Sequence, residues 1–132
     1  MATWDDVERI AMSLPEAQKR NATSGRRQWA IRNRLFVWER PLRKPDLAAL
    51  GGDAPTGPIL GARVEHLVAK EALLADDPRV FFTIPHFDGY SAVLIRLGEI
   101  AVPELEEITA EAWLSVAPKR LVTAFLERRG LA

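Results

Sequence analysis

Residues 26–40 read RRQWAIRNRLFVWER, and their alternation of large apolar and charged side chains predicts a β-hairpin. We place the turn at Asn33-Arg34, because asparagine tolerates the left-handed backbone that two-residue hairpin turns require. The register expected from this turn pairs Ile31 with Phe36, Trp29 with Trp38, and Arg27 with Arg40. On the second, more polar face it pairs Gln28 with Glu39, Ala30 with Val37, and Arg32 with Leu35.

Further elements follow on both sides of this hairpin. Apolar residues at helical spacing predict helices at Thr3–Leu14, at Glu65–Ala75 and from Pro103 onward. Thr3 is the expected N-cap of the first helix, with Asp6 as its capping-box partner. Pro118 either kinks the last helix or starts a fourth. Strand-like runs lie at Ile59–Val64, Arg79–Ile84 and Ala92–Leu97.

Two segments carry loop signals. Residues 16–25 are polar and end in Ser24-Gly25, which indicates a loop. Residues 41–58 contain four prolines and three glycines, so we expect an exposed loop. Within it, we expect Pro45 to start a short turn of helix that Gly51-Gly52 ends.

The order of elements, α-β(3)-α-β(2)-α, favours an α+β fold. Its short connections suit a five-stranded antiparallel sheet with helices packed on one face. At 132 residues the chain is expected to form a single domain spanning residues 1–132.

Composition excludes several classes of function. The chain has no cysteine, which excludes disulfides, thiolate catalysis and cysteine–zinc sites and fits a reducing compartment. The N-terminus lacks the basic and apolar regions of a signal peptide, and no apolar run has the length of a membrane span. We therefore expect a cytoplasmic protein. Arginine outnumbers lysine 14 to 4, a bias typical of GC-rich bacterial genomes.

Charge is segregated along the chain, although the net charge is zero. Residues 19–44 carry nine basic side chains and one acidic side chain. Such a segment can create a local positive field that contacts nucleic-acid phosphates, or it can be a solvated face with acidic neighbours. A sequence pI near 6.7 argues against strong non-specific DNA binding. The candidate contact residues are Arg26, Arg27, Arg32, Arg34, Arg40, Arg43 and Lys44, with Lys119 and Arg120 as possible helpers at a later helix start.

The loop PHFDGYS, residues 85–91, is a second candidate site. His86 and Asp88 could bind a metal or act as an acid–base pair, with Tyr90 beside them. The sequence places no third metal ligand near these two residues, and no nucleophile with an adjacent base. Asp88-Gly89 is also an ordinary turn element. We therefore predict a hairpin loop with neither catalytic residues nor a metal. A loop that contacts a ligand or nucleic acid is the alternative.

Five aromatic residues could form a base-stacking platform, or they could be core residues of the strands. Strand spacing favours the core for this set, which comprises Trp29, Phe36, Trp38, Phe81 and Phe82.

Four stretches together resemble the MmcQ/YjbR family of small bacterial proteins. They are WDDVERIAMSLPEA near the N-terminus, RRQWAIRNRLFVWERP, FFTIPHFDGYSAVLIRL, and ITAEAWLSVAPKRLV near the C-terminus. The resemblance implies an α+β sandwich with an antiparallel sheet, similar to frataxin-like proteins, type III secretion chaperones and a phage transcription factor domain that contacts DNA through its sheet side. It also implies the DNA-binding label that this family often carries, but fold alone is a weak warrant for function.

These observations predict a non-enzymatic, monomeric protein that needs no cofactor and binds DNA weakly through the basic hairpin. A protein-interaction module, which would use exposed sheet or the 41–58 loop, is the alternative. An enzyme or small-ligand binder at His86, Asp88 and Tyr90 ranks third.

Overall fold

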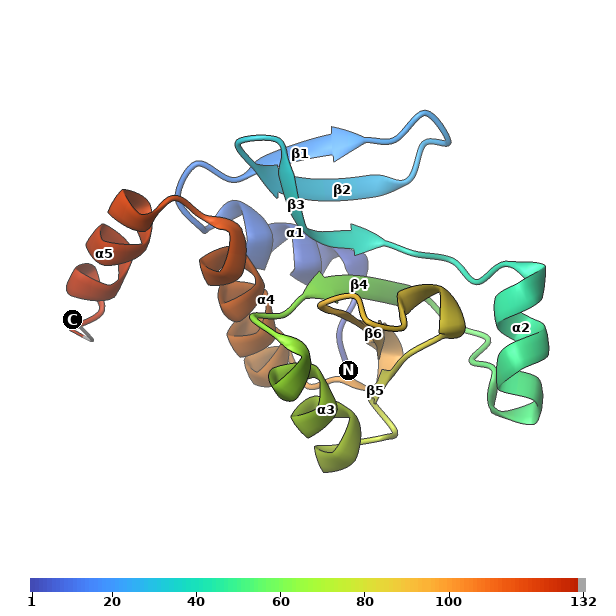
Figure 1. Cartoon of the computed structure of the whole chain (residues 1–132). Helices are drawn as coiled ribbons and strands as arrows, with labels where there is room; N and C mark the ends of the chain where they lie inside the picture. Colours follow the sequence, from blue (N-terminus) through green and yellow to red (C-terminus); the bar gives the residue numbers. More distant parts are fainter. Residues whose placement is uncertain (131–132) are drawn as a thin grey trace.

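A computed structural model describes residues 1–130 of the chain. Its helices are α1 (Trp4–Met12), α2 (Lys44–Leu50), α3 (Leu67–Asp76), α4 (Val102–Val116) and α5 (Lys119–Arg128) (Figure 1). Its strands are β1 (Gln18–Asn21), β2 (Arg27–Ile31), β3 (Arg34–Glu39), β4 (Ile59–Arg63), β5 (Phe81–Phe82) and β6 (Ala92–Arg96). Short 3₁₀ turns are η1 (Gly51–Asp53), η2 (Pro85–Phe87) and η3 (Leu97–Glu99).

The sheet is antiparallel, and its strands lie in the order β1-β2-β3-β4-β6-β5. The α+β class is therefore confirmed, with six strands among the described residues instead of the five expected. The additional strand, β1, lies in the segment that we interpreted as a loop. Its sequence, QKRN, has no apolar alternation, because β1 is an edge strand with largely exposed side chains.

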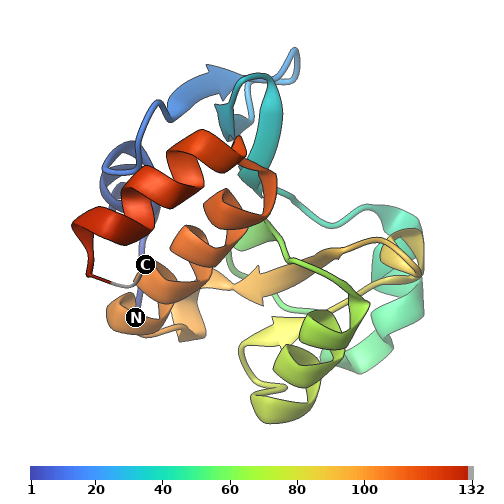
Figure 2. The same cartoon turned by 60° about the vertical axis from the view of Figure 1, so that its left-hand side comes forward.

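The main core lies between the sheet and the helices α1 and α4, which lie against strands β1, β3 and β4. Figure 2 shows α5 following α4 along the same side of the molecule. The fully buried side chains here include Trp29, Phe36 and Trp113. A smaller cluster covers the other face of the sheet over β4, β5 and β6, where Phe87 of η2 meets Phe82 and Leu94. The expected core role of the aromatic residues is confirmed for Trp29, Phe36, Phe81 and Phe82.

The hairpin register differs from the expected one. The turn residues are Arg32 and Asn33, both with positive φ (50° and 65°), so the turn begins one residue earlier than predicted. A bulge between Trp29 and Ala30 then shifts the pairing. The observed pairs are Gln28 with Trp38, Trp29 with Val37, Ala30 with Leu35, and Ile31 with Arg34. The predicted pairs Trp29–Trp38, Ile31–Phe36 and Arg27–Arg40 are therefore wrong, as are those of the second face.

The bulge has a simple physical consequence. Phe36 has no partner on β2, and it is buried in the main core together with its neighbour Val37. Two successive residues of β3 thus point to the same core, which regular alternation would forbid. Trp38 consequently lies on the opposite face, where it packs against Phe87.

Most of the other boundaries agree with expectation. Thr3 caps α1 and forms a capping box with Asp6, as predicted. Hydrogen bonds from the Thr3 backbone, the Arg9 side chain and the Thr3 hydroxyl lower the pKa of Asp6. Pro118 separates two helices instead of kinking one, and α2 ends at Leu50 with Gly51 as its C-cap. The strand expected at 79–84 is reduced to Phe81–Phe82, because the chain turns into η2 at Pro85. Among the described residues, no helix combines the length and apolarity needed to cross a membrane.

Gly61 on β4 lies beneath the indole of Trp38. A Cβ atom built on Gly61 would lie 2.5 Å from Cε2 of that indole. The absence of a side chain at position 61 therefore lets Trp38 lie across the outer face of the sheet and reach Phe87, whose ring centroid is 6.4 Å away.

We predict that Gly61→Ala lowers the free energy of unfolding by about 1–3 kcal/mol, because the new methyl group displaces the indole from its packing position. Urea denaturation followed by circular dichroism measures this loss. Gly98→Ala is the matched control, since a Cβ atom there meets nothing within 4 Å. Equal stability of the two variants would show that Trp38 does not rest on Gly61.

Candidate functional site

The turn between β2 and β3 carries a cluster of cations that several contacts hold in place. Arg20 of β1 donates a hydrogen bond from Nη1 to Oδ1 of Asn33 at 3.2 Å. Arg32 donates from Nε and Nη2 to Oε1 of Glu16, at 3.2 and 3.0 Å. The strands and the preceding loop therefore orient the arginines at this turn, although one carboxylate offsets part of their charge.

The start of α5 lies beside the same turn. Arg34 donates from Nη1 to the carbonyl oxygen of Val116, the last residue of α4, at 3.5 Å. Both Figure 1 and Figure 2 place the α4–α5 junction next to the β2–β3 turn. Lys119 and Arg120 begin α5 and are exposed. We call Arg20, Arg32, Arg34, Lys119 and Arg120 the turn patch.

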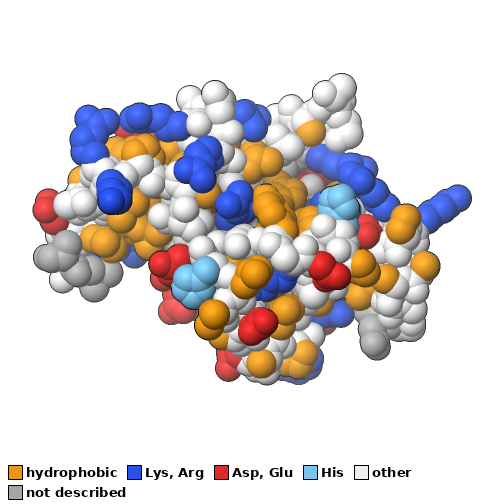
Figure 3. Space-filling view, viewed as in Figure 1, with side chains coloured by type: hydrophobic (Ala, Val, Ile, Leu, Met, Phe, Trp, Pro, Cys, Tyr) orange, Lys and Arg blue, Asp and Glu red, His pale blue; other side chains and the backbone are white. Residues whose placement is uncertain are grey.

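The first turn of α5 contains two cations and no acidic residue. Cations are unfavourable at this end of a helix, because the backbone N–H groups there carry partial positive charge. Together with these N–H groups, Lys119 and Arg120 make the helix start a strongly positive region. Figure 3 shows Lys and Arg side chains along the upper part of this face, with Asp and Glu side chains mostly below them.

The other predicted basic residues lie elsewhere. Arg26 is exposed in the β1–β2 loop, and the guanidinium of Arg27 lies 5.3 Å from the ring centroid of Trp4. Arg40 is buried at the end of β3, and Arg43 and Lys44 are exposed at the start of α2. The nine predicted residues are thus divided among the turn patch, the β1–β2 loop and the α2 region.

Within the described part of the chain, no hydrogen bond, ion pair or ring contact joins the three candidate side chains of the loop 85–91 to one another. His86 is exposed, and with Arg40, Arg43 and Asp46 it lines a cavity of about 280 Å³. Asp88 and Tyr90 do not line that cavity. The hydroxyl of Tyr90 instead accepts a hydrogen bond from Nη1 of Arg63 at 3.3 Å. Among residues 1–130, no group of three potential metal ligands is found.

A buried lysine supports this loop, and the sequence reasoning missed it. Lys70 of α3 is 5% exposed, and its Nζ donates to the carbonyl oxygens of Phe87 at 2.7 Å and Tyr90 at 3.0 Å. Burial lowers the pKa of Lys70, while the charge of Asp88 acts in the opposite direction. One signal was visible in the sequence: Leu73 and Leu74, at helical spacing from Lys70, place this lysine next to the apolar stripe.

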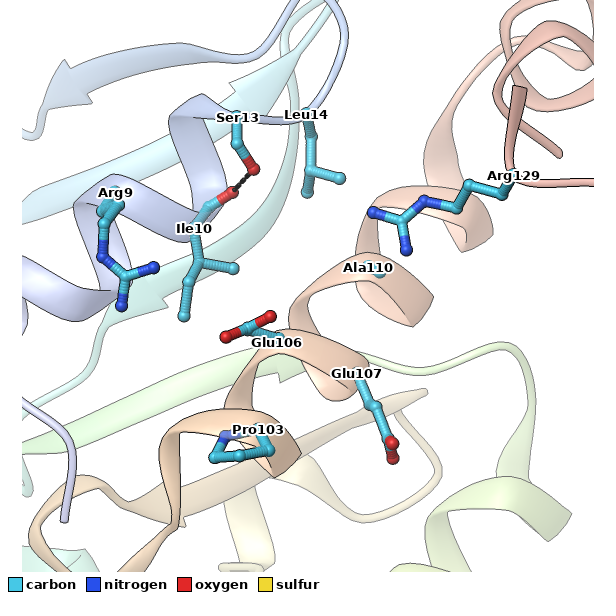
Figure 4. Close-up of a pocket in the computed structure, with 9 residues that line it drawn as sticks. All are labelled: Arg9, Ile10, Ser13, Leu14, Pro103, Glu106, Glu107, Ala110 and Arg129. Atoms are coloured by element: carbon cyan, nitrogen blue, oxygen red, sulfur yellow. Dashed lines mark hydrogen bonds between the residues drawn. The ribbon is translucent and has the colours of Figure 1, made fainter.

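A groove of about 360 Å³ lies between α1, α4 and the end of α5 (Figure 4). Arg9 and Arg129 approach it from opposite sides, and Glu106 projects between them. Arg9 is already paired with Asp6 at 3.2 Å, and the guanidinium of Arg129 covers the ring of Phe125. Balanced charges on exposed helix surfaces are typical of solvated helix packing, so we assign no site here.

The turn patch and the sheet beneath it define a small α+β protein with an open antiparallel sheet and a localised basic surface. Its fold is similar to that of DR2400 from Deinococcus radiodurans, whose crystal structure is described as the domain DUF419. The two align with a TM-score of 0.67 over 100% of this chain and 91% of that chain, at 18% sequence identity. This likeness concerns the fold alone. The domain DUF419 corresponds to MmcQ/YjbR-like proteins, so the fold is the one that the resemblance in sequence implies.

Curated relatives are considerably closer in sequence. The uncharacterised protein Rv2570 of Mycobacterium tuberculosis is 53% identical over an alignment of 133 positions. The alignment covers 98% of this chain and all of that protein. The uncharacterised protein Mb2600 of Mycobacterium bovis matches to the same extent. The chain belongs to the family of these uncharacterised mycobacterial proteins. No family model matches the sequence.

We predict that the stability of the wild type increases, relative to a Lys70→Met variant, as the pH rises through the alkaline range toward 10.5. The folded-state pKa of Lys70 lies below the unfolded value. Between the two values the unfolded chain therefore binds more protons, and deprotonation favours the folded state. Urea denaturation at a series of pH values measures the difference.

Lys44→Met is the control, because Lys44 is exposed and this change should leave the pH dependence unaltered. Parallel curves for the wild type and the Lys70→Met variant would mean that burial does not perturb Lys70.

Proposed function

We propose that this protein is a non-enzymatic nucleic-acid-binding protein that contacts phosphates with the turn patch. The hydrogen bond from Arg34 to Val116 is the observation that carries the proposal. It joins a hairpin turn to the residues just before a helix start, 82 positions away in the chain, so cations from both segments lie in one region of the surface. Sequence proximity alone accounts only for the hairpin side of this arrangement.

The chemistry of the turn patch suits phosphodiester groups. Guanidinium groups match the oxygens of a phosphate in a planar, bidentate geometry, and lysine adds a point charge. None of the five residues is aromatic, so the patch offers charge without base stacking. We therefore expect recognition of the backbone without sequence readout.

The expected affinity is low. Glu16 offsets part of the charge of Arg32, and the net charge of the whole chain is zero. Non-specific binding of this kind has dissociation constants of roughly 10⁻⁴ to 10⁻⁶ M at physiological salt. A weak, salt-sensitive association is consistent with both the basic turn and the near-neutral pI.

The absence of an enzymatic role is part of the proposal. Its support is that His86 lines a cavity that Asp88 and Tyr90 do not line, because acid–base or nucleophilic catalysis needs such groups within hydrogen-bond reach of one substrate.

A protein-binding role is the second candidate, and one observation favours it. A largely apolar groove of about 420 Å³ lies between α3 and α4, with Leu73 and Ile108 in its lining. Its rim carries Glu65, Asp76 and Glu111 against a single arginine. An apolar segment flanked by lysine or arginine would complement this groove.

We predict that a labelled DNA duplex binds with an affinity that falls steeply between about 50 and about 200 mM salt. A Lys119→Gln/Arg120→Gln variant should bind more weakly, and the slope of log K against log [salt] should decrease by about two. Neither side chain has a structural partner among the described residues, so the variant should fold normally. Fluorescence anisotropy measures both quantities.

The matched control is Arg79→Gln/Arg128→Gln, which removes the same charge at two exposed positions outside the turn patch. If the control weakens binding equally, the contact is a diffuse charge effect and the turn patch is not the site. If the wild type fails to bind duplex and single strand even at low salt, nucleic-acid binding is excluded and the α3–α4 groove becomes the surface to test.

A further inference from the structure

A cavity of about 280 Å³ lies between the end of β3, the start of α2 and the turn η2. Its walls come from two segments that lie far apart in the sequence, the basic segment and the loop 85–91. They are Arg40, Arg43, Pro45, Asp46, Pro85 and His86, which we call the Arg–His pocket. The turn patch includes none of these residues.

Arg40 supplies the fixed part of the pocket. It is 8% exposed, and its guanidinium lies 5.8 Å from the ring centroid of Phe87. It donates from Nη2 to Oδ2 of Asp46 at 3.3 Å and from Nη1 to the carbonyl oxygen of Pro41. A guanidinium has five N–H donors, so these two contacts leave donors for a ligand.

Asp46 is committed to holding this arrangement. It is 5% exposed, and its Oδ2 accepts both the hydrogen bond from Arg40 and one from the backbone N–H of Arg43 at 2.9 Å. The carboxylate thus fixes the Arg40 side chain and the Arg43 backbone in one position. It also neutralises only one of the two arginine charges.

The exposed donors of the pocket are the side chains of Arg43 and His86. Neither side chain has a hydrogen-bond partner among residues 1–130. Figure 3 shows Lys and Arg side chains beside a histidine on this face. The two arginines and the one aspartate of the pocket lining together carry one net positive charge.

We propose that the Arg–His pocket binds a phosphate monoester. Three donor groups, from Arg40, Arg43 and His86, suit the three terminal oxygens of such a ligand better than the two oxygens of a carboxylate. The volume exceeds that of the phosphate group alone, and Pro45 and Pro85 provide apolar walls for the attached organic part. The one carboxylate in the lining, Asp46, is already paired with Arg40, so the pocket has no free acidic ligand for a cation.

A phosphate monoester could be the terminal phosphate of a nucleic-acid strand or a small free molecule. The pocket is independent of the proposed function, because inorganic phosphate can be tested without any contact to the turn patch. The two sources are separated by comparing inorganic phosphate with oligonucleotides that differ only in their terminal group.

The experiment is a titration of the full chain with inorganic phosphate at constant pH and ionic strength, with chloride as the replacement ion. Two-dimensional ¹H–¹⁵N NMR spectra are the readout. We expect saturable shifts confined to residues around Arg43 and His86. The Arg43→Gln variant should bind phosphate about tenfold more weakly, as expected for the loss of one charge-assisted contact.

Arg43 is the residue to replace because it is exposed and its structural contact is made by its backbone, whereas loss of Arg40 would leave Asp46 buried without its partner. His86→Gln should weaken binding in the same direction, and Arg79→Gln should leave it unchanged. Shifts that do not saturate, or that persist equally in both pocket variants, would overturn the proposal.

The second arm compares a 5′-phosphorylated short DNA strand with the same strand bearing a 5′-hydroxyl. Tighter binding of the phosphorylated strand, lost in Arg43→Gln but retained in Lys119→Gln/Arg120→Gln, identifies a nucleic-acid terminus as the source. Saturable phosphate binding without this difference identifies a small phosphate monoester. If strand binding is lost only in Lys119→Gln/Arg120→Gln, the strand binds at the turn patch and its terminal phosphate is not the ligand of the pocket. The phosphate titration then decides whether the pocket binds a small phosphate monoester.

Discussion

The bulge in the β2–β3 hairpin is the constraint on which the rest of the structure depends. With one unpaired residue at Phe36, β3 directs Phe36 and Val37 into the main core and Trp38 to the opposite face. Without it, a turn at Arg32-Asn33 would reverse the facing of every later side chain of β3. The bulge therefore decides which aromatic residues fill the core and which residue supports the loop 85–91.

The basic segment illustrates how tertiary contacts divide a charge run. Some of its cations are engaged by the fold: Arg40 is paired with Asp46, and Arg32 with Glu16. Others remain exposed, and two groups of these cations lie next to residues from a distant part of the chain. Lys119 and Arg120 join the turn, and His86 joins the α2 region. One run of charge thus contributes to two surfaces: the open turn patch, for which we propose contact with a polymer backbone, and the Arg–His pocket, for which we propose a single phosphate group.

Two buried cations support the outer face of the sheet. Lys70 binds the carbonyl oxygens of Phe87 and Tyr90, and Arg40 packs near the ring of Phe87. Buried charges are costly unless hydrogen bonded, and here the loop backbone and Asp46 supply the partners. The loop that carries His86 is therefore anchored from both sides, which gives the Arg–His pocket a defined wall although the loop contains only a single 3₁₀ turn.

The sequence by itself determined the α+β class, the helices α1, α3 and α4, the cap at Thr3 and most of the core, whereas it left open whether Pro118 kinks α4 or starts α5. These features depend on periodicity, capping and apolar spacing, which are local properties of the chain. It did not reveal β1, whose four polar residues form a strand only because β2 offers an unpaired edge. It also misplaced the hairpin register, since a bulge is favoured by the core that it helps to fill and not by its own residues.

For the candidate sites, the sequence identified the basic residues and His86 but not their grouping. Contacts such as Arg34–Val116, Arg40–Asp46 and Lys70–Phe87 decide which side chains are available and which are structural. These contacts join segments that only the packed sheet and helices bring together. Residue types and local patterns were therefore readable in advance, whereas the partners of each charge were decided by the tertiary structure, because pairing depends on distances in space and not along the chain.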